Sequence, residues 1–232
     1  MQLNLTLQRP ESSEPLTFNF TRMINAGYVG RDQEVVRKYI AELAAKGIPG
    51  PKSTPVLFPV NPRALVIDED IEVYGSQTAG EVEYVLLIQD AQTIYVGMGS
   101  DHTDRLLEET DIPRSKQICP NVMSPVVWLL SDVVPHWDEL TFDSQVVKDG
   151  ETIANQDGRL ATILNPESLM AFVRSKVGDD LGGTLIFSGT VGTISGQYIY
   201  GERFIAGLHD PILNRSLSVN YGVLPLDYLG AE

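Results

Sequence analysis

Three acidic residues in the middle of the chain have the spacing of a metal site. Glu81 and Glu83 are one residue apart at the start of an apolar run, 84–88, so their side chains share one face if the segment is extended. A second strand-like run, 93–96, leads to Asp101, and a hairpin return would bring that carboxylate back beside the pair. Three converging carboxylates repel one another unless a cation neutralises them. Oxygen-only ligands suit Mg²⁺, Mn²⁺ or Ca²⁺, so the sequence predicts a divalent-cation site.

A second interpretation of the same residues needs no ligand. Antiparallel strands commonly show a polar face to water, and Glu81 and Glu83 would then be ordinary exposed side chains. Asp101 is also a residue type that starts turns and caps helices. The two interpretations differ in geometry, because a metal site requires the three carboxylates to converge and exposed residues would be scattered.

The composition of the whole chain excludes several classes of function. Its 232 residues are 43% hydrophobic and carry a formal net charge of −14, whereas nucleic-acid binding normally needs a basic surface. No uncharged apolar run approaches membrane-spanning length, and the first twenty residues lack a signal-peptide core. The single cysteine, Cys119, excludes an intramolecular disulfide, which fits a reducing compartment. We therefore expect a cytoplasmic protein that binds neither nucleic acid nor membrane.

The elements that must position the acidic residues form a β-rich α+β pattern with a few helices. Apolar alternation or buried apolar runs predict strands at 1–9, 16–20, 64–67, 71–74, 84–88, 93–96, 140–147, 155–163, 184–187 and in the tail, 198–226. Helical patterns occur at 32–46, 106–109, 128–138 and from Asn165 onwards, where a proline follows a potential N-cap. The proline-rich stretch 49–62 predicts an extended connector without regular structure.

Four short motifs in this order resemble the fumarylacetoacetate hydrolase (FAH) superfamily. They are Glu81-x-Glu83, Asp101-x-Thr103-x-Arg105, Lys116 followed by Ser124-Pro125, and Ser188-Gly189-Thr190. The matching core covers residues 65–210, and the segments 100–105 and 31–42 look like an uncharacterised bacterial branch of the superfamily. The resemblance implies an FAH-like mixed β-roll or barrel, usually a homodimer. It divides the chain into an N-terminal strand–helix extension, 1–60, and a catalytic domain, 61–232.

The resemblance also implies roles for the motif residues. Glu81, Glu83 and Asp101 would ligate the divalent cation. Lys116 would face the substrate and add positive charge where an oxyanion develops. Arg105 would brace the metal-ligand loop by pairing with a carboxylate, or it would contact the substrate itself.

The implied substrate is a small 2-oxo acid or a dicarbonyl carboxylate. The loop Ser188-Gly189-Thr190 would hold its carboxylate or oxo group through Thr190 and the backbone N–H groups around Gly189. The reaction would be C–C hydrolysis, decarboxylation, hydration or isomerisation through a metal-bound enolate. The sequence does not choose among these reactions.

The chain departs from the superfamily in its general base. Hydrolytic members use a His–Glu pair whose histidine precedes the E-x-E motif, but the histidines here are His102, His136 and His209. His102 is the obvious substitute, because it adjoins Asp101 and imidazole titrates near neutral pH. Adjacent residues of a strand point to opposite faces, however, so His102 either lines the site or points away from it. For His136 and His209 a structural role is the expectation.

Two further acidic residues are candidates for supporting roles. Asp104 would accept a hydrogen bond from His102 or Lys116, and Glu202 would supply the glutamate of a dyad. Glu108 stands where the superfamily often has a glutamine.

A different class of function stays open from sequence alone. A binding or assembly protein on the same fold would retain a cation for structure only, and the missing upstream histidine favours this alternative. Lys116 and Thr190 argue against it, since a structural metal site needs neither.

Overall fold

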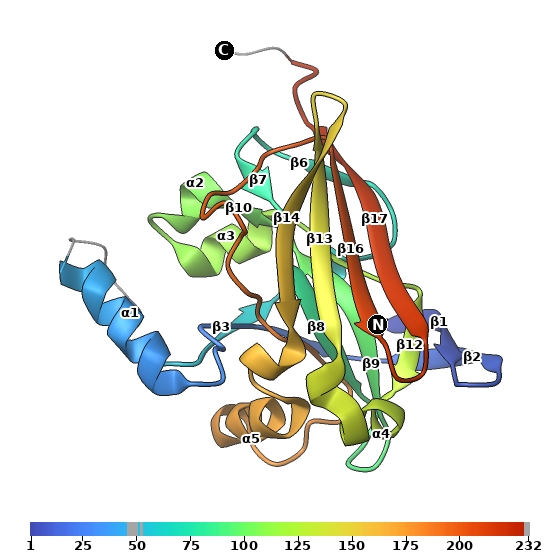
Figure 1. The fold of residues 1–232 in the computed structure, drawn as a ribbon. Coiled ribbons are helices and arrows are strands. Elements are labelled where there is room, and N and C mark those ends of the chain that lie inside the picture. The colour runs from blue at the N-terminus through green and yellow to red at the C-terminus, as the bar shows by residue number, and fades with distance from the viewer. Residues whose placement is uncertain (46–50, 52, 230–232) are drawn as a thin grey trace.

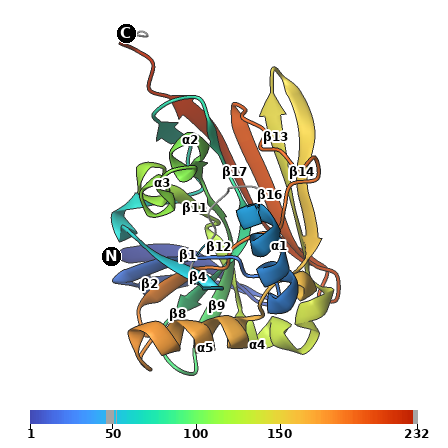
Figure 2. The same cartoon turned by 90° about the vertical axis from the view of Figure 1, so that its left-hand side faces the viewer.

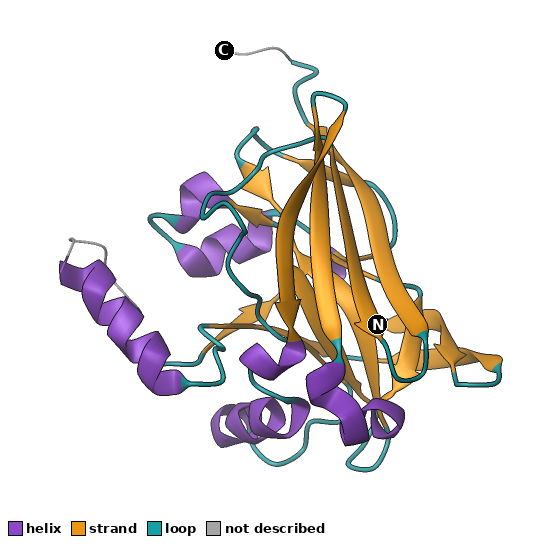
Figure 3. Cartoon of the chain, viewed as in Figure 1, coloured by secondary structure: helices purple, strands orange, loops and turns teal. Residues whose placement is uncertain are grey.

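The computed structural model describes residues 1–45, 51 and 53–229, and most of its regular structure is strand (Figure 3). Ten strands form one large sheet whose main path runs β2-β1-β12-β9-β8-β15-β3-β4, with β5 and β11 attached beside β9. Its members are β1 (Gln2–Gln8), β2 (Ser13–Asn19), β3 (Arg22–Gly27), β4 (Val56–Val60), β5 (Leu65–Ile67), β8 (Val82–Ile88), β9 (Ile94–Asp101), β11 (Asn121–Met123), β12 (Val126–Leu129) and β15 (Thr184–Phe187).

A second, five-stranded sheet curls over the first and crosses in front of β8 and β9 (Figure 1). Its order is β14-β13-β16-β17-β6, from β6 (Ile71–Val73), β13 (Thr141–Lys148), β14 (Glu151–Arg159), β16 (Arg203–Asp210) and β17 (Arg215–Pro225). The short strands β7 (Thr78–Ala79) and β10 (Thr103–Asp104) pair with each other. The predicted β-rich fold with few helices is confirmed, and the curled sheet forms a half-barrel.

The helices lie at the periphery of the sheets (Figures 1 and 2). They are α1 (Gln33–Ala45), α2 (Arg105–Glu108), α3 (Ile112–Ile118), α4 (Leu130–Val133) and α5 (Pro166–Val177), with 3₁₀ turns at Pro62–Ala64, Val134–Glu139 and Leu160–Thr162. Helix α1 stands away from the body (Figure 1), whereas α2 and α3 pack beside the sheets (Figure 2). Within the described residues no helix is both long and apolar enough to cross a membrane.

Strand β8 is buried on both faces and divides the core in two. Tyr84 and Leu86 belong to the hydrophobic cluster between the two sheets, where they join Phe142 of β13. Val85 and Leu87 alternate with them and belong to the cluster that β1 and β2 cover. The period-two alternation of a strand therefore fixes the direction of every side chain of β8.

Most predicted elements are present, and the signals that start or join them are the expected ones. Asp32 accepts hydrogen bonds from the N–H groups of Glu34 and Val35 as an N-cap of α1. The predicted end of that helix at Lys46 lies outside the described residues. Strands β13 and β14 are joined by Asp149-Gly150, whose φ angles of +53° and +78° are those of a two-residue hairpin turn.

Two predictions are wrong in detail. Trp128 is not in a helix but in β12, between β1 and β9, and the helix starts only at Leu130. Part of the predicted connector is strand β4, which pairs with β3 at the edge of the sheet; an edge position tolerates Pro59 because one side of the strand is unpaired. Residues 49, 50 and 52 of that connector lie outside the described residues.

The division of the chain at residue 60 stays a prediction. Strands β1, β3 and β4, which come from these first residues, are hydrogen-bonded into the large sheet with β12 and β15.

Candidate metal centre

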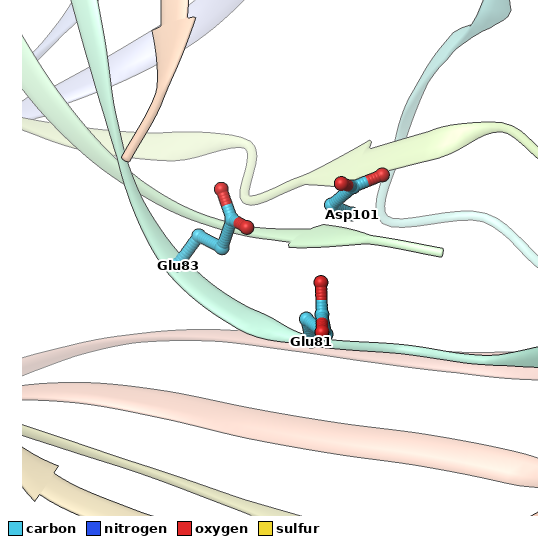
Figure 4. A group of neighbouring side chains, drawn as sticks. All are labelled: Glu81, Glu83 and Asp101. Carbon is cyan, nitrogen blue, oxygen red and sulfur yellow. The ribbon is translucent and has the colours of Figure 1, made fainter. Parts of the chain in front are cut away.

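The hairpin of β8 and β9 brings the three predicted carboxylates together. The strands pair antiparallel with Val82 opposite Ser100, and the Asp101 N–H donates to the Glu81 carbonyl at 3.3 Å. One oxygen from each of Glu81, Glu83 and Asp101 lies within 4.8 Å of the others. Figure 4 shows the three carboxylates turned toward a common point. They converge and are not scattered.

The cluster is buried, and two cations lie against it. Glu83 and Asp101 are each 1% exposed. Lys116 Nζ is 2.7 Å from Asp101 Oδ2 and 3.4 Å from Glu81 Oε2. Arg105 Nη1 lies 3.2 Å from Glu81 Oε1. Three carboxylates thus face two cations, and the local charge is unbalanced.

This imbalance separates the pKa values of the three acids. Burial raises the pKa of Glu83 well above its ordinary value, and the charges of Asp101 and Glu81 raise it further. Burial also raises the pKa of Asp101, although Lys116 opposes the shift. Burial acts in the same direction on Glu81, but Arg105 and Lys116 outweigh it, so the pKa of Glu81 lies below its ordinary value.

The donor set fits a hard divalent cation. Glu83 has no cationic partner among the described residues, and its Oε2 accepts only the Gly189 N–H, at 2.9 Å. A divalent ion among the three carboxylates would supply the missing positive charge and allow Glu83 to ionise. Glu81, Glu83 and Asp101 would be its protein ligands, and carboxylate oxygens favour Mg²⁺, Mn²⁺ or Ca²⁺.

Helix α3 carries Lys116 into the cluster. Asp111 caps the helix through a hydrogen bond from the Arg114 N–H, and a proline occupies the first turn. Lys116 is buried, and its Nζ also donates to Thr103 Oγ1 at 2.9 Å. Burial lowers the pKa of Lys116, but the charges of Asp101 and Glu81 outweigh it and raise that pKa above its ordinary value. The ammonium is therefore charged at neutral pH.

Arg105 pairs with a carboxylate of the cluster, which is the contact that one of its two predicted roles requires. Its guanidinium donates to Glu108 Oε2 at 2.8 Å and to the Ala79 carbonyl at 3.2 Å. The ring of Tyr198 lies 4.0 Å from the guanidinium carbon, and its hydroxyl accepts from Nη1 at 3.2 Å. Burial raises the pKa of Tyr198 to about 12, so this phenol stays protonated.

A ring of hydrogen bonds fixes the backbone between the two glutamates. The Val82 N–H donates to Gln156 Oε1 at 3.0 Å, and Gln156 Nε2 donates to Thr190 Oγ1 at 2.9 Å. Thr190 Oγ1 in turn donates to the Val82 carbonyl at 2.6 Å. Gln156, on β14, was not predicted from sequence. Its only sequence signal is a polar residue at an inward position of a strand.

The rest of the loop 188–190 lies against the cluster in a turn that requires glycine at its centre. Gly189 has φ +78°, and a Cβ there would approach Val29 Cγ2 to 2.6 Å and the Ala26 carbonyl to 2.9 Å. Ser188 is buried and donates to the Gly189 carbonyl at 2.7 Å. Gly189 and Thr190 line the adjacent cavity, but Ser188 does not.

His102 points away from the carboxylates. Its ring nitrogens lie 3.0 Å from Tyr221 Oη and 3.0 Å from Thr78 Oγ1, on the opposite side of the strand from Asp101. Burial lowers the pKa of His102 to about 3, so the ring is neutral. Of the two expected orientations, the structure has the one outside the cavity.

Asp104 and Glu202, the two acidic residues expected to support the site, accept hydrogen bonds from backbone N–H groups outside it. Asp104 Oδ1 accepts the Leu107 N–H as the N-cap of α2, so the predicted bond from His102 or Lys116 is absent; the hydrogen-bonding needs of the helix terminus decide its direction. Glu202 Oε1 accepts the Asp149 N–H at the β13–β14 turn and does not line the cavity.

The other two histidines pair with aspartates outside the cavity. His136 Nε2 lies 2.9 Å from Asp210 Oδ1. His209 Nε2 lies 2.6 Å from Asp143 Oδ2.

A cavity of about 530 Å³ opens onto the cluster. Charged residues that line it are Glu81, Glu83, Arg105, Glu108, Glu109 and Lys116. Aromatic and aliphatic residues from other segments complete its wall; they are Ala26, Tyr28, Phe58, Ile112, Tyr198 and Tyr200. Sequence reasoning did not predict that these residues meet, because nothing in their local pattern joins their segments.

The fold is similar to that of several solved structures. A putative fumarylpyruvate hydrolase from Burkholderia cenocepacia has 16% sequence identity, with a TM-score of 0.65 over 97% of this chain and 92% of that chain. A 2-keto-3-deoxy-D-arabinonate dehydratase, complexed with magnesium and 2,5-dioxopentanoate, has 16% identity and a TM-score of 0.64 over 89% and 74% of the two chains. A 2-hydroxyhepta-2,4-diene-1,7-dioate isomerase from Mycobacterium marinum has 15% identity and a TM-score of 0.63 over 97% and 88%.

The resemblance to the FAH superfamily is confirmed. The chain belongs to the family described as "Protein of unknown function (DUF2848)", which matches residues 26–221. This agrees with the predicted similarity to an uncharacterised branch. Comparison with curated protein sequences finds no significant match.

Proposed function

We propose that the protein is a divalent-metal-dependent enzyme that acts on a small 2-oxo acid or dicarbonyl carboxylate through an enolate. The observation that carries the proposal is the convergence of Glu81, Glu83 and Asp101 at a cavity that Lys116 and Arg105 also line. Structural neighbours that are a dehydratase, a hydrolase and an isomerase support enolate chemistry in general. The particular reaction is C–C hydrolysis, decarboxylation, hydration or isomerisation.

The chain's own residues would each contribute a defined step. The cation, when bound, would polarise the oxo group of the substrate. Lys116 would place its ammonium beside the developing oxyanion, and Arg105 would hold Glu81 in position. The Thr190 hydroxyl is engaged by Val82 and Gln156, so we assign binding of the substrate carboxylate to the backbone N–H of Thr190.

Glu108 is our candidate for the proton acceptor that the missing histidine would otherwise provide. It lines the cavity, is not one of the three converging carboxylates, and its Oε1 lies 3.6 Å from Lys116 Nζ. A substrate whose oxyanion lies beside Lys116 would bring its proton near this carboxylate, which would accept it directly or through one water. His102 is not assigned this role, because both its ring nitrogens are hydrogen-bonded on the other side of the strand.

Enolisation can be tested before the natural substrate is found. Exchange of the C3 protons of 2-oxobutanoate in D₂O, followed by NMR with excess Mg²⁺ or Mn²⁺, measures it directly. We expect catalysed exchange in the wild type and a loss of about 10²–10³-fold in Lys116→Met, the usual effect of removing an oxyanion-stabilising group. Glu108→Gln should also lose exchange.

Both variants should still be stabilised by metal, since neither residue is a proposed ligand. A wild type that binds metal but exchanges no faster than buffer would favour the alternative of a structural cation on a non-catalytic protein.

We also propose a homodimer in the cytoplasm. The apolar residues Leu224, Leu226 and Tyr228 near the C-terminus are 40–80% exposed, which supports burial against a second copy. The one cysteine is buried, and the net charge of −14 supports a small-molecule partner over nucleic acid. Light scattering coupled to size exclusion tests the dimer.

A further inference from the structure

A second, mostly apolar cavity adjoins the one at the carboxylates. This second cavity has a volume of about 480 Å³. None of the three converging carboxylates lines it, and the residues that it shares with the first cavity are Tyr28, Phe58, Thr110 and Ile112. The shared residues therefore lie between a charged end and a second compartment, whose further lining includes Val56, Pro113 and Asp111. A ligand anchored at the carboxylates would extend along Phe58 and Ile112.

Two elements hold these side chains in place. Ile112 begins helix α3 and precedes Lys116 by four residues, so the two side chains lie on one face of the helix, one turn apart. Phe58 is on the edge strand β4, which pairs with β3. A Cβ on Gly27 would already contact the Phe58 ring at 3.4 Å, so glycine leaves room for that ring.

The charges that line the two cavities disfavour an anionic group far from the three carboxylates. Among the described residues that line the two cavities, the only cations are Arg105 and Lys116, and both are paired with acids at the metal cluster. Further out, the charged residues are Glu109 and Asp111. A second carboxylate on the substrate would meet acids and apolar side chains without a partner.

We infer that this compartment is a binding site for an uncharged, apolar arm of the substrate, so that the preferred 2-oxo acid is a monocarboxylate with an alkyl or aryl tail. The inference rests on the proposed function of the metal cluster and specifies the substrate class. It separates this chain from the M. marinum neighbour, whose name specifies a dioate. Each buried methylene strengthens binding by about fourfold, so a tail of several carbons has a measurable effect.

Three ligands that share the 2-oxo acid group test the inference by calorimetry in excess Mg²⁺. They are pyruvate, 2-oxooctanoate and 2-oxooctanedioate, which has the same chain length as 2-oxooctanoate but a second carboxylate. We expect 2-oxooctanoate to bind at least tenfold more tightly than pyruvate, and 2-oxooctanedioate to bind at least tenfold more weakly than 2-oxooctanoate.

The variant Ile112→Lys places a cation on the path and should reverse the preference between the two eight-carbon ligands. Ile212→Lys is the matched control, because Ile212 is 58% exposed and lines neither cavity; it should keep the wild-type ratio. If pyruvate binds and 2-oxooctanoate binds no more tightly, the inferred site for an apolar arm is overturned, whereas the proposed function of the carboxylates stands. Failure of all three ligands to bind in excess Mg²⁺ overturns the proposed function and this inference with it.

Discussion

Gln156 should couple the stability of the fold to the affinity for metal, because its amide holds the peptide groups between two proposed ligands. Gln156 is 2% exposed, and its Oε1 accepts from the Val82 N–H, the Ser144 hydroxyl and the Asn155 amide, while its Nε2 donates to Thr190 and Val191. In Gln156→Met the side chain keeps similar bulk but leaves the Val82 N–H without a partner.

The expected loss follows from these bonds. An unsatisfied buried donor costs about 1–3 kcal/mol, and each further lost bond about 0.5–1.5 kcal/mol. Taking the low end of these ranges for the lost bonds, we expect Gln156→Met to lower the free energy of unfolding by at least about 3 kcal/mol. For a chain of this length that corresponds to a fall in Tm of roughly 6–12 °C. Loss of a group that orients metal ligands typically weakens metal binding by about 10–100-fold.

The control is Ser144→Ala. Ser144 belongs to the same buried network, since its hydroxyl donates to Gln156 Oε1 and accepts from Asn155, but its hydroxyl is hydrogen-bonded to neither Val82 nor Thr190. It should lose about 1 kcal/mol of stability and keep its metal affinity. Calorimetric titration with Mn²⁺ and urea unfolding measure the two quantities. Equal losses of metal affinity in both variants would refute a positioning role for Gln156.

Two further predictions concern the turn at Gly189 and the acid stability of the fold. Gly189→Ala should lower the free energy of unfolding by about 2–4 kcal/mol in urea titrations. The cost has two sources, the left-handed φ of this residue and the contact of the added Cβ with Val29. An unchanged free energy of unfolding would show that the loop relaxes. Hydrogen bonds from the Leu213 N–H and His136 overcome the effect of burial and keep the pKa of Asp210 below its ordinary value. Asp210 therefore stabilises the fold above the unfolded-state pKa of about 3.9, and this stability is lost as the pH falls through the lower folded-state value. Asp210→Asn should be less stable than wild type at pH 7, with a gap that narrows toward pH 2 in pH-dependent thermal unfolding; a constant gap would contradict this.

The convergence of the three carboxylates was predictable from sequence, because it depends on local geometry. Glu81 and Glu83 lie at the start of one strand and Asp101 at the end of the next, so the alternation of side chains and one hairpin determine their convergence. The same alternation also decides His102: Asp101 and Thr103 face Lys116, and His102 necessarily faces the other way.

The parts that sequence reasoning missed depend on contacts between distant segments. Gln156 reaches Val82 and Thr190 from the second sheet, and no local pattern links strands that far apart. Trp128 has a helix-like neighbourhood, but pairing with β9 and β1 overrides it. Phe58 lies in a proline-rich stretch whose strand exists only because β3 offers an edge.

The central claim is that Glu81, Glu83 and Asp101 bind a divalent cation. The most direct test is thermal unfolding at pH 7 in EDTA and then in millimolar Mg²⁺, Mn²⁺ or Ca²⁺, for the wild type, Glu83→Gln and the surface control Glu151→Gln. A cation at a hundredfold excess over its dissociation constant stabilises the native state by about 2.7 kcal/mol, or roughly 5–11 °C in Tm at this chain length.

We predict this upward shift for the wild type and for Glu151→Gln. Glu83→Gln should be at least as stable as the wild type in EDTA, because burial and the neighbouring Asp101 and Glu81 raise the pKa of Glu83 and an amide removes the ionisable group, and it should not respond to metal. An equal response of Glu83→Gln and the wild type, or no response in either, would contradict the metal site.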